Sequence, residues 1–179
     1  MNETIDENFR HIRTLAADID GKLTGTSVAE QRLRNELAGM FAVTIAATYE
    51  GIVRETLISY AGAFHPKYRN HVEKDFEKLN AKISLDDLAF YSRRFGLAEW
   101  TGHKVKKNKT TFHKLLDEKR IKVERRFRAD MLLSYENIFT WRHAYAHERK
   151  LSATFRDVYE AHRVAQYVIR SFVKAFEIG

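Results

Sequence analysis

The chain has 179 residues, a formal net charge of +7, one proline, eight glycines and no cysteine. The lack of cysteine excludes disulfides, thiolate metal sites and cysteine nucleophiles, and so few glycines and prolines argue against an all-β fold. The length suits a single domain spanning 1–179. The acidic start is unlike a signal peptide, and the longest uncharged run, Leu37–Tyr49, is too short to cross a membrane. We therefore expect a cytoplasmic protein with no membrane partner.

The first quarter of the chain predicts two helices. Apolar residues spaced three or four apart from Ile5 to Leu23 predict an amphipathic helix. The next helix runs from about 28 to 63 and is apolar on nearly every face at its centre, which is typical of the central helix of a bundle. Small residues there, such as Gly39, favour the close approach of a neighbouring helix.

The middle of the chain predicts shorter elements. A third helix covers about 68–83, after a break at Pro66. Ser84 and Asp87 have the spacing of a capping box, which opens a short helix that Gly96 ends. Residues 97–110 lack apolar periodicity and predict a loop.

The last third of the chain predicts long helices. One runs from Thr111 to about Trp141, and the last carries an apolar stripe from Phe155 to Phe176, with Thr154 as its N-terminal cap. With little or no strand anywhere, the sequence predicts an all-α fold, an antiparallel helical bundle of about five to six helices.

The positive charge is concentrated in one stretch. Residues 104–128 contain eleven Lys or Arg and three acidic residues, a net charge of +8, whereas the rest of the chain sums to −1. Such a local field attracts polyanions and favours nucleic acid as a partner. A solvated loop followed by a charged helix face is the alternative interpretation. The candidate RNA-binding residues are Lys104, Lys106, Lys107, Lys109, Arg120, Arg125, Arg126 and Arg128.

Two histidines have the spacing of metal ligands. His143 and His147 are four residues apart, so on a helix they share a face, as in the zinc-binding motif His-Glu-x-x-His. Ala144 stands where that motif has its glutamate, and no third ligand lies nearby in the sequence. A two-histidine metal protein is therefore an alternative, which bound metal in the purified protein would reveal, whereas our main expectation includes no metal and no cofactor.

Arg142 and His147 suit acid–base chemistry on a phosphodiester. Histidine transfers protons near neutral pH, and arginine binds phosphate and neutralises the charge that develops on it. RNA cleavage needs both, because the 2′-hydroxyl must lose a proton while it attacks the adjacent phosphorus. This internal nucleophile requires no metal, and DNA lacks it. In a purely structural interpretation, Arg142 pairs with a carboxylate and His147 caps a helix end.

The segment resembles the motif of the HEPN domains, a family of small all-α proteins. Their motif is Arg, a polar residue, three residues of which some are small or apolar, and His, ahead of a terminal helix. Arg142, His143, Ala144–Ala146 and His147 fit it. The resemblance implies a metal-independent endoribonuclease, a toxin or anti-phage defence effector, with an antitoxin or defence-system partner. An inactive HEPN-like module that binds RNA or protein is the alternative.

The resemblance also implies an active site assembled from two copies across a homodimer, and helix geometry agrees. Five residues of α-helix place Arg142 and His147 about 140° apart around the axis, so they do not easily grip one phosphate from one chain. Two motifs that face each other solve this. We expect Arg142 to bind phosphate, His147 to be the general base or acid, and His143 to be a second polar contact. The candidates for supporting positions are Glu50, Tyr145 and His162, of which His162 also fits a core histidine.

Overall fold

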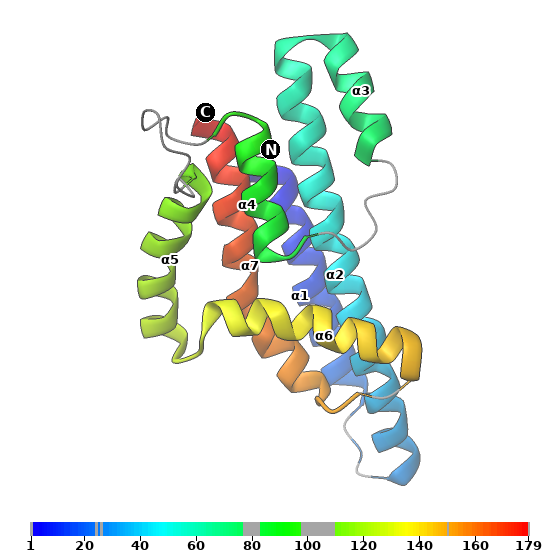
Figure 1. Ribbon diagram of the computed structural model, residues 1–179. Helices are drawn as coiled ribbons and strands as arrows, with labels where there is room; N and C mark the ends of the chain where they lie inside the picture. Colours follow the sequence, from blue (N-terminus) through cyan, green and yellow to red (C-terminus); the bar gives the residue numbers. More distant parts are fainter. Residues whose placement is uncertain are drawn as a thin grey trace. The chain divides into compact units, whose positions relative to one another are not determined.

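The computed structural model describes residues 2–23, 25, 27–76, 83–97, 110–149 and 151–178. Within these ranges the chain forms seven α-helices and no β-strand (Figure 1), which confirms the all-α fold that the sequence predicts. The helices are α1 (Asn2–Lys22), α2 (Val28–Phe64), α3 (Pro66–Phe76), α4 (Leu85–Arg94), α5 (Thr111–Phe127), α6 (Met131–Glu148) and α7 (Phe155–Ile178).

The chain forms two compact units, each built from separate stretches of sequence. The first unit comprises 1–48 and 132–166, and therefore contains α1, the first part of α2, nearly all of α6 and the first part of α7. The second unit comprises 49–131 and 167–179, with the remainder of α2 and α7 and with α3, α4 and α5. The Arg-His motif thus belongs to the first unit, and the basic helix α5 belongs to the second.

The core of the first unit joins α1, α2 and α7. Phe9 and Ile12 of α1 are fully buried. Phe41 of α2 packs against Phe155 of α7, with ring centroids 4.8 Å apart. Since Phe155 is the first residue of α7, this pair fixes the start of that helix against α2. The apolar stripes predicted for the first and last helices have therefore formed the core.

Helix α2 is long and apolar at its centre. By length and composition alone it could cross a membrane, and half of its most apolar 18-residue window is buried inside the protein. Ala42, Ile45 and Ala46 are fully buried there. A core helix of a soluble protein has these same properties, so the cytoplasmic location stays a prediction.

The segment 111–141 is not the single helix that the sequence predicts. Arg128 adopts a left-handed φ of 54°, and a new helix begins at Met131. Glu124 stabilises this break, because its Oε1 accepts hydrogen bonds from Arg120 Nε at 2.8 Å and from the Met131 amide at 3.2 Å. Apolar residues keep a helical spacing across the break, which explains why the pattern alone predicts continuity.

The short helix α4 begins and ends as predicted. The Asp87 amide donates to Ser84 Oγ at 3.2 Å, and the Ser84 amide donates to Asp87 Oδ2 at 3.0 Å, which completes the capping box. Gly96 follows the helix with a φ of 76°, a conformation that favours glycine. Residues 98–109 of the predicted loop, and residues 77–82 of the predicted third helix, lie outside the described residues.

Candidate active site

The Arg-His motif occupies the last two turns of α6. Arg142 is half-buried, whereas His143 and His147 are exposed to solvent. The difference in exposure agrees with the helix geometry, which turns Arg142 and His147 about 140° apart. Within one chain, therefore, α6 does not bring its arginine and its second histidine to one face.

The two histidines lie side by side. The ring centroids of His143 and His147 are 4.4 Å apart, with an interplanar angle of 48°. Two imidazoles at this separation can serve a single substrate group as proton donor and acceptor. Across the parts of the chain that the structure describes, no three His, Cys, Asp or Glu side chains gather into a group that could hold a metal ion. The pair is thus two adjacent imidazoles, both exposed to solvent, on a regular helix.

Tyr145 attaches the motif to α2. Its ring lies directly over Gly39, where a Cβ atom would overlap the ring, and its hydroxyl donates a hydrogen bond to Glu36 Oε2 at 3.0 Å. The close approach that the small residues of α2 predict is therefore real at Gly39, and Tyr145 is the group that approaches. Because Tyr145 lies between Arg142 and His147 in the chain, this contact sets the position of both.

The surroundings of Tyr145 favour the protonated form of its hydroxyl, which donates the hydrogen bond to Glu36. Burial of the side chain and its hydrogen bond to the Glu36 carboxylate raise the pKa of Tyr145, and the nearby Arg149 opposes this shift. The Arg149 guanidinium lies 5.7 Å from the centre of the Tyr145 ring. Arg149 also ends the helix, with a left-handed φ of 52° and its amide donating to the Tyr145 carbonyl oxygen at 3.1 Å. Tyr145 and Arg149 thus lie against each other at the C-terminal end of the motif.

The other two predicted supporting residues differ in their surroundings. His162 is fully buried in α7, and its ring meets Phe9 edge to face with centroids 5.6 Å apart, which is the environment of a core histidine. Glu50 is half-buried on α2 and belongs to the second unit, whereas the motif belongs to the first. For Tyr145 the structure shows a direct contact between the motif and α2, whereas supporting roles for Glu50 and His162 stay predictions.

The predicted RNA-binding residues fall into three groups. Arg120 is half-buried and forms ion pairs with Glu124 at 2.8 Å and with Asp130 at 3.5 Å, so part of its charge is compensated within the protein. Three other arginines on α5 or at its end are exposed to solvent. The four lysines lie outside the described residues. The exposed arginines are Arg125, Arg126 and Arg128, and the lysines are Lys104, Lys106, Lys107 and Lys109.

Glu36 is a residue of this site that the sequence did not reveal. It lies 109 positions from Tyr145, so no spacing rule connects the two. The one available signal for Glu36 is Gly39, which lies three residues further along α2 on the same face. Its small size indicates that another part of the chain packs closely against that face.

A family model described as RiboL-PSP-HEPN matches residues 4–177. Because this match covers nearly the whole chain, the chain belongs to that family of HEPN domains, as its motif predicts. No curated protein and no solved structure matches the chain. Membership of a HEPN family suggests a ribonuclease-like or related function. A more specific function has to be argued from the side chains of α6, because a fold alone does not determine function.

Proposed function

We propose that the protein is a metal-independent endoribonuclease that acts through Arg142, His143 and His147. The observation that carries the proposal is the pair of imidazoles 4.4 Å apart, beside an arginine, on one helix of a HEPN-family domain. Histidine moves protons near neutral pH, and arginine binds phosphate. RNA is the expected substrate because it carries its own nucleophile, the 2′-hydroxyl, and therefore needs no metal to generate one.

The proposed reaction balances with these groups alone. His147 takes the proton of the ribose 2′-hydroxyl while that oxygen attacks phosphorus, and Arg142 neutralises the charge of the crowded phosphorane. The bond from phosphorus to the 5′-oxygen then breaks, and a protonated imidazole, for which His143 is the candidate, gives its proton to that oxygen. The products are an RNA ending in a 2′,3′-cyclic phosphate and an RNA beginning with a 5′-hydroxyl.

The complete site, in this proposal, forms between two copies of the chain. Arg142 and His147 lie on different faces of α6, so an arginine of one copy has to act with a histidine of the other. The exposed face that carries the histidines continues along α6 through Thr140 and Glu136 to Leu133, whose exposed fraction is 54%. In the composite site that we propose, this exposed face is the one that meets the second copy.

The test is cleavage of total RNA by the purified protein, with and without a chelator. Arg142→Ala and His147→Ala should each lower the cleavage rate by about 10² to 10⁴, the loss typical of a positioned acid–base group. The helical circular dichroism signal should stay unchanged. His11→Ala is the matched control, because His11 is an exposed histidine of α1 and should be dispensable.

Each other result points to a different conclusion. Full activity in either motif variant contradicts the proposal. Cleavage that disappears with EDTA and returns with zinc assigns the histidines to a metal site. RNA binding without cleavage makes the protein an inactive HEPN module. The proposed role as a toxin or defence effector predicts that expression slows bacterial growth and that both motif substitutions remove this effect.

A further inference from the structure

Two of the eight histidines of the chain have the spacing of metal ligands on a helix. His143 and His147 are four positions apart on α6, and both side chains are exposed to solvent. No other two histidines are three or four positions apart in the sequence. Side chains at this spacing lie on one face of a helix, one turn apart. The two imidazoles can therefore reach a single metal ion without any change in the backbone.

The separation of the two rings fits a shared ion. Zinc lies about 2.0 to 2.1 Å from a histidine nitrogen. An ion at that distance from one nitrogen of each ring keeps the ring centres about 4.6 Å apart at a right angle and about 5.3 Å apart at the tetrahedral angle. The centroids of His143 and His147 are 4.4 Å apart, close to the lower of these values. A small rotation of two exposed side chains is therefore enough to hold an ion between them.

The chemistry of the two ligands selects the kind of ion. Imidazole suits Zn²⁺, Ni²⁺ and Cu²⁺, whereas Mg²⁺ and Ca²⁺ prefer oxygen ligands. Across the residues that the structure describes, no third His, Cys, Asp or Glu completes a metal-binding group. Water therefore fills the remaining positions of an ion bound by the pair, as it does at metal sites that keep an open position. A site with two protein ligands is open to solvent, and a chelator can empty it.

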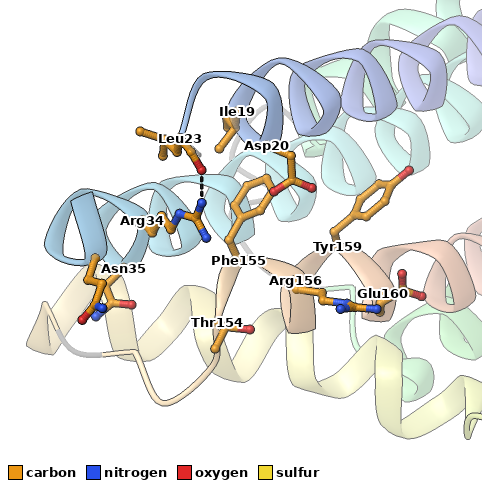
Figure 2. Close-up of a pocket in the computed structure, with 11 residues that line it drawn as sticks. Ile19, Asp20, Leu23, Arg34, Asn35, Thr154, Phe155, Arg156, Tyr159 and Glu160 are labelled. Atoms are coloured by element: carbon orange, nitrogen blue, oxygen red, sulfur yellow. Dashed lines mark hydrogen bonds between the residues drawn. The ribbon is translucent and has the colours of Figure 1, made fainter. Parts of the chain in front are cut away.

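The cavity of the first unit is a poorer place for a cation. It has a volume of about 700 Å³ and opens where the end of α1 and the start of α2 meet the start of α7, with Asp20 and Glu160 in its lining (Figure 2). Glu160 accepts two hydrogen bonds from Arg163, at 2.9 Å and 2.8 Å, and Figure 2 shows Arg156 beside the same carboxylate. Arg34 adds a further positive charge to the lining. Because these cations repel a metal ion, the cavity serves as the control for binding by carboxylates.

We propose that His143 and His147 bind a transition metal ion such as Zn²⁺, and that the bound ion switches the nuclease off. A neutral imidazole has one nitrogen that can accept a proton, and a metal ion occupies that same nitrogen. A pair that holds the ion can then neither take the proton of the 2′-hydroxyl nor supply one to the 5′-oxygen. The inhibition rests on the proposed ribonuclease activity, whereas the metal site does not.

The metal site is tested by calorimetry with zinc chloride on the full chain. His143→Ala and His147→Ala should each weaken zinc binding at least about tenfold, since even the outer-shell partners of metal ligands are worth about 10 to 100 in affinity. His11→Ala and His71→Ala are the matched controls, because each removes an exposed histidine outside the pair. Asp20→Asn is the control for the cavity. Circular dichroism checks that every variant is folded.

All three control variants should bind zinc as the wild type does. The wild type should bind Cu²⁺ more tightly than Ni²⁺ or Zn²⁺, bind Mn²⁺ more weakly than these, and not bind Mg²⁺, which is the order expected for imidazole ligands. Zinc binding that survives either substitution in the pair overturns the proposal, and so does zinc binding that Asp20→Asn removes. Because calorimetry needs no cleavage, a protein without ribonuclease activity still decides the metal site.

The switch is tested by cleavage of single-stranded RNA by the wild type at increasing zinc concentration. At about ten times the Kd that calorimetry gives, about a tenth of the activity should remain, because that fraction of the sites is empty. EDTA should restore the activity, and the same concentration of Mg²⁺ should leave it unchanged. Zinc that occupies the pair without lowering cleavage overturns the switch. Failure to cleave RNA when no metal is added contradicts the proposed function instead.

Discussion

Gly39 determines how closely the motif helix approaches α2. A Cβ atom at Gly39 would overlap the ring of Tyr145, whereas one at Gly51, on the same helix, would meet nothing within 4 Å. In a helix interior, alanine is more stable than glycine by about 1 kcal/mol when nothing obstructs the added methyl group. The same substitution therefore has opposite consequences at these two positions.

We expect Gly39→Ala to destabilise the protein by about 1 to 3 kcal/mol, the usual effect of overpacking. It should also lower RNA cleavage, because Tyr145 has to move and the motif moves with it. Gly51→Ala is the control, and it should raise stability by up to about 1 kcal/mol. Urea denaturation measures both. Equal effects of the two substitutions would contradict the close contact between Gly39 and Tyr145.

The part of the candidate site that the sequence predicts lies within one short segment. Arg142, His143 and His147 fall within six positions, and their helical spacing alone indicates that the two histidines share a face. By contrast, the hydrogen bond between Glu36 and Tyr145 joins residues 109 positions apart in the sequence. Contacts of that kind depend on tertiary packing, which no local pattern encodes.

At the scale of the helix, the cap of α7 is a pH-sensitive element. The Asp157 amide donates to Thr154 Oγ1 at 3.2 Å, and the Thr154 amide donates to Asp157 Oδ2 at 2.8 Å. The hydrogen bond from the Thr154 hydroxyl to the carboxylate, at 2.7 Å, is the main reason why the pKa of Asp157 lies below its ordinary value. The cap is therefore strongest while Asp157 is ionised.

This cap should make part of the stability depend on pH. Because the pKa of Asp157 is lowered by folding, its contribution is fully present above the unfolded pKa of about 3.9 and disappears as the pH falls through the folded pKa. Thr154→Ala should lower the free energy of unfolding by about 1 kcal/mol at pH 7 and flatten its decline below about pH 4. Denaturation curves between pH 3 and pH 7 measure this, with Asp157→Asn as the control that removes the titrating group. A decline as steep as that of the wild type would contradict the prediction.

Helix boundaries were predictable where a capping pattern marks them. The capping boxes that begin α4 and α7 are visible in the sequence as Ser84 with Asp87 and as Thr154 with Asp157. The break before α6 has no such pattern. Arg128 adopts a left-handed conformation there, which is usually adopted by glycine, so its residue type does not mark the helix end. A carboxylate from the preceding helix stabilises the new start. The spacing of apolar residues predicts the all-α fold correctly, but it does not reveal a break between two successive helices of this kind.

For the whole molecule, the shared active site can be tested by mixing inactive variants. Arg142→Ala and His147→Ala proteins, each inactive alone, should recover part of the cleavage when combined, because some mixed dimers carry one intact site. The protein should also be a dimer at micromolar concentration by sedimentation. If the subunits demonstrably exchange and no activity returns, the site lies within a single chain.

The concentrated positive charge predicts a salt effect. If Lys104, Lys106, Lys107 and Lys109 bind the RNA backbone, neutralising all four should weaken binding and flatten the salt slope by about 0.7 for each phosphate that is no longer neutralised. KM should rise more than kcat falls, since these residues position the RNA and move no proton. The control neutralises four exposed lysines elsewhere and should leave the slope unchanged. If the salt slope of RNA binding is unchanged when Lys104, Lys106, Lys107 and Lys109 are neutralised, these lysines belong to a solvated surface that does not bind RNA. The control positions are Lys22, Lys67, Lys74 and Lys174.

The first unit combines residues 1–48 with residues 132–166, and this has a consequence during synthesis of the chain. A ribosome adds roughly 5 to 20 residues per second, so the N-terminal stretch waits on the order of ten seconds for the rest of its core. The bond from Tyr145 to Glu36 forms only after that interval. Until residue 145 has been made, Glu36 therefore lacks this contact, and the end of α6 gains its fixed position only late in the synthesis of the chain.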